Sequence, residues 1–160
     1  MKRLIAAAAV LAVGVSIAVT SVGGAQQSGE RTLKFVEKGG SGKFIDNPPK
    51  ASKRHPRPSA GDELLFTTGL YDTNNARAGT VRGHCVKEPG AGNAFDCQAD
   101  ATLKDGTLAL SAVTNETSLK TVIAITGGTG AYEGARGSIV SIARSHADNA
   151  PSDDTVHLLG

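Results

Sequence analysis

The sequence predicts an all-β protein, an eight-stranded antiparallel up-and-down barrel that follows a cleaved signal peptide. Short alternating stretches rich in β-branched and aromatic residues recur along the chain, and turn signals separate them. No convincing helical pattern follows the N-terminal segment. Strands joined in order by short turns, with one apolar face, favour a closed barrel over a sandwich. An eight-stranded barrel encloses side chains and about one small ligand.

The N-terminal segment has the pattern of an export signal. Lys2 and Arg3 precede an apolar run over residues 4–19, and small residues at 23–25 offer a cleavage point before Gln26. We therefore expect residues 1–25 to be a signal peptide and residues 26–160 to form one secreted, extracellular domain with no membrane attachment after processing. An uncleaved anchor is the alternative, although the apolar run is short for a membrane span.

The charge balance argues against nucleic acid as a partner. Processing removes Lys2 and Arg3 from the 17 basic residues and leaves 15 basic against 15 acidic ones. Binding to phosphates requires a basic excess, which the mature chain lacks. The sequence contains no metal-ligand spacing, no phosphate-binding loop and no Ser-His-Asp arrangement. We expect neither a cofactor nor a metal.

The first half of the mature chain contains four predicted strands, at residues 32–37, 63–71, 76–87 and 94–103. The first places Leu33, Phe35 and Glu37 on one face, so Glu37 extends an apolar stripe. The commoner case would be an exposed carboxylate at a strand end. Residues 38–61, rich in proline, glycine and basic side chains, are assigned to a long loop, which is either solvated or a lid over a cavity.

Two cysteines flank a strong turn signal at residues 88–93. Strands that pair symmetrically about this turn place Cys85 opposite Cys97. Cysteines of exported proteins usually pair, so we expect a Cys85–Cys97 disulfide. Two free thiols or a metal-binding pair are the alternatives, although two cysteines alone do not make a zinc site.

The Asp105-Gly106 pair is the tightest hairpin signal in the chain. Closing the hairpin there pairs Leu103 with Leu108 and Ala101 with Leu110, so that apolar positions meet apolar positions. The inward side chains are often small, namely Gly83, Ala99, Ala101 and Ala112. Small inward residues leave either a cavity or a densely packed core, and the sequence does not decide between them.

The glycine-rich stretch at residues 126–137, TGGTGAYEGARG, lies between two strand-like runs and is predicted to be a shaped connection. A dinucleotide site is excluded because such a site requires a following helix. The strands at residues 119–125, 136–143 and 155–159, with the second arm of the hairpin, bring the count to eight. Both faces of residues 119–125 are apolar, which suits a strand covered on its outer side by a partner.

Two stretches carry a resemblance to a known family. Residues 61–88 (GDELLFTTGLYDTNNARAGTVRGHCVKE) resemble plant allene oxide cyclases, and residues 123–137 (IAITGGTGAYEGARG) resemble both those cyclases and the dirigent proteins. The chain is thus similar to secreted bacterial members of the allene oxide cyclase-like and dirigent-like barrel superfamily. The resemblance implies a calycin-type barrel, a cavity for a lipid- or phenol-sized molecule, and a homo-oligomer, either a dimer or a trimer.

The resemblance also implies roles for individual residues. Glu37 matches the cyclase glutamate that stabilises developing positive charge, and Phe66 matches a pocket aromatic. Gly39 and Thr68 stand where the cyclases have asparagines that hold a structural water, and no pocket tyrosine is matched. Arg136 matches the arginine of the dirigent glycine motif. The candidate ligand-binding residues are Phe66, Thr68, Tyr71 and Arg136, and the candidate catalytic residue is Glu37.

Three functions are compatible with these observations. The first is an isomerase-like barrel that binds a small apolar or phenolic molecule and steers its cyclisation or coupling. The second is a secreted binding or surface protein with the same barrel and no chemistry. The third is a structural oligomer whose outer wall makes the contacts. A cavity lined by Glu37 favours the first, and an interior filled with side chains excludes ligand binding.

Overall fold

The computed structural model describes residues 29–50, 58–90, 92–115, 117–147 and 149–159. The predicted signal peptide, residues 1–25, lies outside these ranges and stays a prediction. The same holds for the basic residues Lys53, Arg54, His55 and Arg57 of the predicted loop. Within the described residues, no helix has the length and apolar character needed to cross a membrane.

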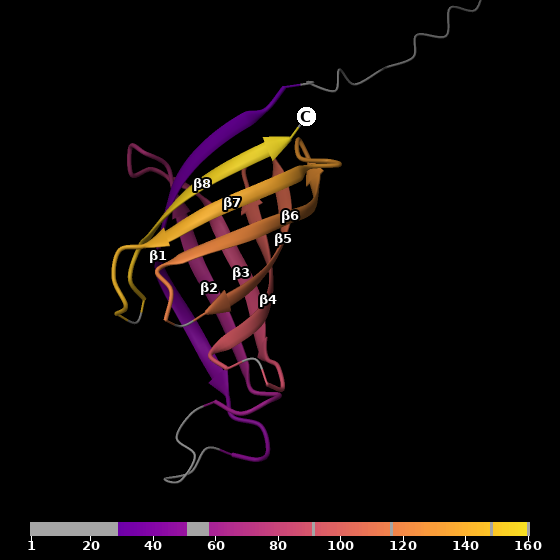
Figure 1. Ribbon diagram of the computed structural model, residues 1–160. Helices are drawn as coiled ribbons and strands as arrows, with labels where there is room; N and C mark the ends of the chain where they lie inside the picture. Colours follow the sequence, from indigo (N-terminus) through magenta and orange to yellow (C-terminus); the bar gives the residue numbers. More distant parts are fainter. Residues whose placement is uncertain (1–28, 51–57, 91, 116, 148, 160) are drawn as a thin grey trace, which may run out of the picture.

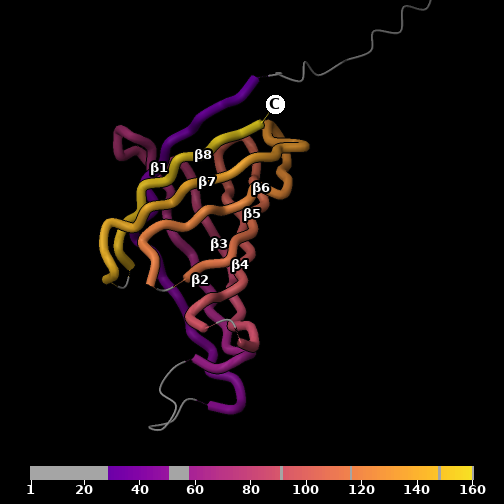
Figure 2. The backbone as a smooth tube through the Cα atoms, in the orientation of Figure 1, coloured from indigo at the N-terminus to yellow at the C-terminus, as the bar shows by residue number. Residues whose placement is uncertain are grey.

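Eight antiparallel strands form a closed barrel in which each strand pairs with its neighbours in the chain and β8 returns to pair with β1 (Figure 1). The predicted architecture is confirmed. The chain passes around the wall in sequence order, as the tube in Figure 2 traces. The strands are β1 (Arg31–Ile45), β2 (Glu63–Tyr71), β3 (Arg77–Lys87), β4 (Ala94–Leu103), β5 (Gly106–Asn115), β6 (Lys120–Gly130), β7 (Arg136–Ala143) and β8 (Ser152–Leu159).

Inward and outward side chains alternate along each strand. The inward apolar side chains form two clusters. The larger cluster gathers residues from most strands, and its most deeply buried members are Leu108 and Val156, which are 1% and 2% exposed. The smaller cluster contains Cys85, Phe95 and Cys97, packed against Leu64 and Phe66.

The strand β1 is longer than the sequence predicts. Residues 38–61 are assigned to a loop from their composition, but β1 continues to Ile45, and this part of the assignment is wrong. Gly39 adopts a φ of +68°, and the pairing with β2 shifts between Lys38 and Ser41. The glycine-rich segment therefore forms a β-bulge, after which the ladder resumes.

The glycine-rich connection is shorter than predicted. The strand β6 runs through Gly130, and only residues 131–135 connect it to β7. A side chain at Gly128 would place its Cβ 2.3 Å from the carbonyl oxygen of Tyr132, so glycine allows the connection to fold back onto the strand. Tyr132 is 9% exposed and packs this corner. The motif is therefore mostly strand and tight corner.

The hairpin between β4 and β5 is shifted by two residues from the prediction. Leu103 pairs with Gly106 and Ala101 with Leu108, so the turn consists of Lys104 and Asp105. Gly106 stays in the ladder because it also pairs with Gly130 of β6. A shift of two residues leaves every side chain on its predicted face, because the side-chain period of a strand is two.

The predicted disulfide is confirmed. Cys85 and Cys97 are directly paired across β3 and β4 and are joined by a bond between their sulfur atoms. Next to it, the buried Lys87 donates hydrogen bonds from Nζ to the carbonyl oxygens of Gly92 and Ala94, and its Nζ lies 4.9 Å from the centroid of the Phe95 ring. The β3–β4 turn is thus anchored covalently and by a buried cation.

Replacing both cysteines, as in Cys85→Ala/Cys97→Ala, should lower the free energy of unfolding by about 2–4 kcal/mol, because the unfolded chain then loses a cross-link. Urea denaturation measures this loss. Wild-type protein unfolded in a reducing agent should approach the stability of the double variant. Equal stability of the oxidised wild type and the double variant would contradict a stabilising role for the disulfide.

Candidate functional site

A cavity of about 310 Å³ lies inside the barrel. The interior is therefore not filled by side chains, which settles the alternative that the sequence leaves open. Its lining is mainly apolar, from Phe35, Phe66, Ala99, Ala101 and other core residues. One side is polar, where Glu37, Asp154, Ser141 and Ser152 line the cavity. The cavity size is at the lower end of the range for small-molecule sites.

The pairing of β1 with β8 brings the two carboxyl groups together. Glu37 pairs with Ser152, and Phe35 pairs with Asp154, so that Glu37 and Asp154 are diagonal neighbours. Diagonal side chains on one face lie within reach of each other when they are long. Asp154 is only 6% exposed although it is a carboxylic acid.

Hydroxyl groups surround this carboxyl pair. Thr68 Oγ1 donates to Glu37 Oε1 at 2.5 Å, and Ser152 Oγ donates to Asp154 Oδ1 at 3.1 Å. Ser141 also hydrogen-bonds the Asp154 carboxyl, from the neighbouring strand β7. Three strands other than β1 thus contribute partners to the pair.

Burial raises the pKa of the Glu37 carboxyl. The hydrogen bond from Thr68 opposes this increase, and the charge of Asp154 adds to it, as does a hydrogen bond between the two carboxyl groups. Burial also raises the pKa of Asp154, against hydrogen bonds from Ser141 and Ser152. The interaction between the two carboxyl groups, through charge and a hydrogen bond, links their protonation. The two groups therefore titrate as a coupled pair.

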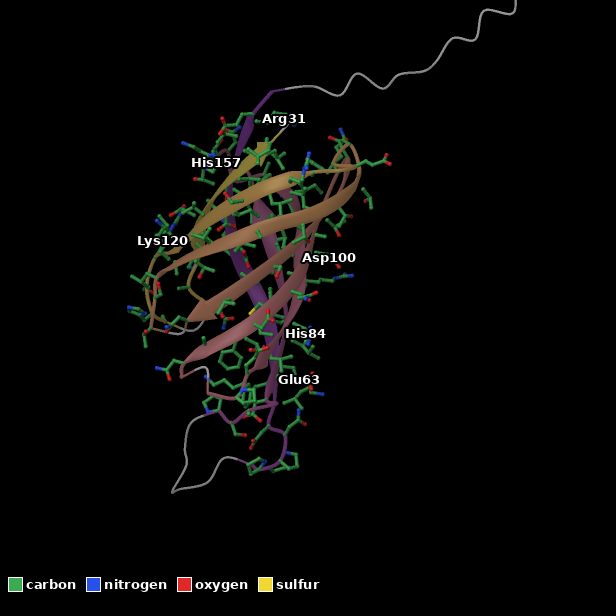
Figure 3. The ribbon with its side chains drawn as sticks, turned by 45° about the vertical axis from the view of Figure 1, so that its right-hand side comes forward. Arg31, Glu63, His84, Asp100, Lys120 and His157 are labelled. Atoms are coloured by element: carbon green, nitrogen blue, oxygen red, sulfur yellow. A yellow bond between two sulfur atoms is a disulfide. The ribbon has the colours of Figure 1, made fainter. Side chains whose placement is uncertain are left out.

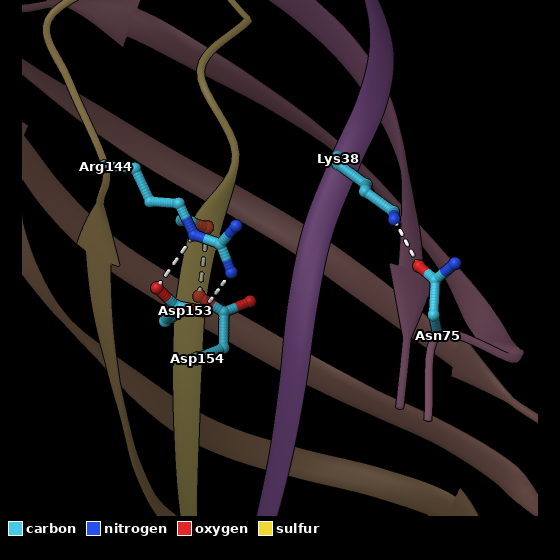
Figure 4. A network of polar contacts seen from close by, with 6 residues as sticks. Lys38, Asn75, Arg144, Asp153 and Asp154 are labelled. Atoms are coloured by element: carbon cyan, nitrogen blue, oxygen red, sulfur yellow. Dashed lines mark hydrogen bonds and ion pairs between the residues drawn. The ribbon is translucent and has the colours of Figure 1, made fainter. Parts of the chain in front are cut away.

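The neighbouring Asp153 has a different environment, because alternation turns it to the outside. Arg144 binds it through two hydrogen bonds, from Nε at 3.0 Å and from Nη2 at 2.7 Å (Figure 4). Both side chains of this ion pair are about half exposed, at 52% and 56%. Arg144 is thus occupied at the outer surface, on Asp153.

The sequence-predicted site residues have different positions. Glu37 and Phe66 line the cavity. Thr68 is not a lining residue, but it hydrogen-bonds the Glu37 carboxyl. Tyr71 and Arg136 are not among the lining residues. Tyr71 follows the inward Leu70 and packs against Lys38 Nζ, 4.5 Å from the ring centroid, and Arg136 is exposed at the start of β7. The structure does not bring Tyr71 and Arg136 to the cavity.

Sequence reasoning missed Asp154. The predicted eighth strand starts at residue 155, whereas β8 starts at Ser152. Extending the alternation of Val156 and Leu158 back by two positions would have placed an aspartate on the apolar face. An acidic residue in such a stripe is the signal that could have identified it.

The outer wall has a different character. His84 and Asp100 are exposed on it, on β3 and β4 (Figure 3). His84 is therefore away from the cavity, as the strand alternation predicts. No group of three or more His, Cys, Asp or Glu side chains in the described part of the chain is placed to hold a metal ion.

The wall is incomplete next to the polar side of the cavity. The ladder between β5 and β6 ends at Ser111 and Ala124, although β5 continues to Asn115 and β6 starts at Lys120. Thr114 and Thr121 line the cavity from these two separated strand segments. The cavity thus extends to the part of the wall where β5 and β6 are not paired with each other.

Comparison with solved structures identifies the same barrel in other proteins. Pyocyanin demethylase matches with a TM-score of 0.65 and 20% identity, over 80% of this chain and 99% of that chain. A pterocarpan synthase dirigent protein matches with a TM-score of 0.65 and 16% identity, over 84% and 97%. The exo-specific intermolecular Diels–Alderase AbnU matches with a TM-score of 0.59 and 15% identity, over 81% and 98%.

No protein-family model and no curated protein matches the sequence. The barrel fold of this chain is shared with a dirigent protein, as the resemblance to dirigent proteins leads us to expect. At such low identity the likeness concerns the fold, and the site must be argued from this chain's own residues.

The raised pKa values of Glu37 and Asp154 predict a stability effect with a definite sign. The folded state binds these protons more tightly than the unfolded chain does. The free energy of unfolding therefore decreases as pH rises from the pKa values of the unfolded chain through those of the folded protein. Glu37→Gln should therefore stabilise the protein relative to wild type, and the gain should grow between pH 4 and pH 8. Denaturation at several pH values measures it.

Asp100→Asn is the matched control, since it removes one exposed carboxylate from the outer wall. Its stability difference from wild type should show little of that pH dependence. A gain for Glu37→Gln that is constant across the range would contradict the raised pKa values.

Proposed function

We propose that this chain is an exported barrel that binds one small, mainly apolar or phenolic molecule in its cavity and steers a redox-neutral cyclisation of it. The observation that carries the proposal is the pairing of the buried Asp154 carboxyl with the partly buried Glu37 carboxyl on one side of a mainly apolar cavity of about 310 Å³. Apolar walls confine a flexible molecule in a folded conformer, and confinement lowers the entropic part of a cyclisation barrier.

The carboxyl pair supplies the chemistry in this proposal. A hydroxyl group of the ligand adds to a conjugated C=C bond, so a ring C–O bond forms and the π bond breaks. Protonated Glu37 gives a proton to the carbonyl oxygen that receives the displaced electron pair, and the Asp154 carboxylate accepts the proton that the hydroxyl group loses. Atoms and charge balance, because the ligand is isomerised and one proton moves from Glu37 to Asp154. The hydrogen bond between the carboxyl groups returns that proton. Acids with raised pKa values suit such exchange near neutral pH.

The comparisons support the same class of activity. The structurally similar proteins include a pterocarpan synthase dirigent protein, an intermolecular Diels–Alderase and a cyclase that catalyses a [4 + 2] cycloaddition. Each uses a barrel of this fold on a small organic molecule. Dirigent-type coupling of two radicals is a related possibility for the cavity, with a separate oxidase as the source of the radicals.

Filling the cavity tests ligand binding. Ala101→Leu adds side-chain volume at a cavity-lining position, whereas Ala109→Leu adds the same volume on the outer face of β5. A phenol or terpenoid at about 100 times its Kd should stabilise wild type and Ala109→Leu by about 2.7 kcal/mol. It should not stabilise Ala101→Leu. Thermal unfolding with a panel of such compounds measures this, and equal stabilisation of all three proteins contradicts binding in the cavity.

Catalysis is tested separately from binding. Products formed from a bound compound should fall at least about 100-fold in Glu37→Gln and in Asp154→Asn, because each variant loses one side of the proton exchange. Both variants should still be stabilised by the compound. Binding without any product in wild type would favour the non-catalytic binding protein.

A second candidate function, a structural oligomer, is favoured by the outer wall. Val113, Val122 and Ile142 lie on the neighbouring strands β5, β6 and β7 and are 70%, 58% and 48% exposed. If this apolar surface joins copies of the chain, Val122→Lys should convert a wild-type oligomer to monomer in light scattering at micromolar concentration. Thr129→Lys, an exposed position on the same strand, is the control. A wild-type monomer would contradict this candidate.

A further inference from the structure

The charges around the cavity are unbalanced. Among the described residues that line it, Glu37 and Asp154 are the only ionisable acids or bases, and the remainder are apolar or carry hydroxyl groups, apart from the disulfide. Two carboxyl groups that share one proton keep one net negative charge. Asp154 is buried, and an uncompensated charge on a buried group is costly.

Three basic side chains on or next to the strands of the wall have other partners. On β1, Lys38 contacts the Tyr71 ring of β2 and hydrogen-bonds Asn75. Past the end of β7, Arg144 binds Asp153 of β8. Lys87 donates to two backbone carbonyl groups beside the disulfide. None of these three lines the cavity, and the charge of Asp153 opposes ionisation of Asp154.

The carboxyl pair has aromatic residues as neighbours. Phe35 pairs with Asp154 across β1 and β8, and Phe66 also lines the cavity. Carboxylates supply Coulombic attraction to a cation, and aromatic faces attract an ammonium group whose body is apolar. The combination favours a ligand whose positive charge is attached to an apolar framework.

We propose that the cavity selects small organic cations, namely protonated amines or quaternary ammonium compounds with an apolar body, over neutral and anionic molecules of the same shape. The inference rests on the proposed function, since it assumes that the cavity takes a ligand, and it names the ligand class. A cation neutralises the charge of the carboxyl pair, whereas an anion adds a second negative charge.

Selection of a cation couples binding to the release of a proton. Burial raises the pKa values of both carboxyl groups, so the uncharged pair with two protons persists to higher pH than it would in water. A bound cation replaces this second proton. The affinity for a permanently charged cation therefore increases as pH rises, until the pair has lost the proton. The affinity for a neutral molecule does not gain in this way.

Three phenols that differ only in one para substituent test the proposal: (4-hydroxyphenyl)trimethylammonium, 4-tert-butylphenol and 4-hydroxybenzenesulfonate. The substituents have the same tetrahedral shape and carry a positive charge, no charge and a negative charge. At pH 8, calorimetry on wild type should show the cation binding at least about tenfold more tightly than the neutral phenol. The sulfonate should show no binding, and the preference for the cation should decrease towards pH 5.

Variants separate this proposal from the proposed function. The double variant Glu37→Gln/Asp154→Asn, which has no carboxyl group in the cavity, should lose the preference for the cation while still binding 4-tert-butylphenol, which shows that the barrel is folded. Asp100→Asn, with the same change of charge on the outer wall, should keep the preference. If wild type binds 4-tert-butylphenol as tightly as the cation at pH 8, cation selection is wrong and ligand binding stands. If none of the three binds, both are overturned.

Discussion

Closure of the barrel through β1 is the constraint on which the rest of this structure depends. The strand pairs with β2 on one side and with β8, the last strand, on the other. Because side chains alternate, the β1–β8 register decides that Phe35 and Glu37 face inward beside Asp154. A slip of β1 by one residue would turn Phe35 and Glu37 to the outside, away from Asp154. The hydrophobic core and the polar side of the cavity are therefore specified by one register.

That register requires an energetic compromise. Glu37 and Asp154 occupy inward positions that apolar residues would fill with greater stability, and burial raises the pKa values of both. Hydroxyl groups of Thr68, Ser141 and Ser152 offset part of this cost without adding charge. Groups that lower stability at an otherwise apolar cavity are typical of sites shaped by function.

Most of the fold could be predicted from the sequence. The strand order, the bounds of β2, β4 and β7, the Cys85–Cys97 pairing and the inward faces all follow from alternation and turn signals. The predicted loop at residues 38–45 was wrong because composition does not distinguish a glycine-rich loop from a glycine-rich bulge within a strand. The hairpin was misplaced by two residues because Gly106 is held by β6, a contact distant in sequence.

The site was less predictable than the fold. Glu37 was identified from an apolar stripe that it extends, but the cavity depends on the sum of many side-chain volumes, and the sequence gives no direct access to that sum. Asp154 was missed because the edge of a strand is the least certain part of any assignment. Arg136 was chosen from its motif, yet its position on β7 turns it outward.

The bulge at Gly39 divides β1 into two parts with different registers against β2. Before it, Glu37 pairs with both β2 and β8, and after it, β1 pairs with β2 alone up to Ile45. A bulge contains one extra residue in one strand, so the side chains after the bulge can alternate independently of those before it. Changes in the length or composition of the segment that leads out of Ile45 can therefore accumulate without rotating Glu37 out of the cavity. The bulge thus separates the part of β1 that lines the cavity from the part that leads to Ile45.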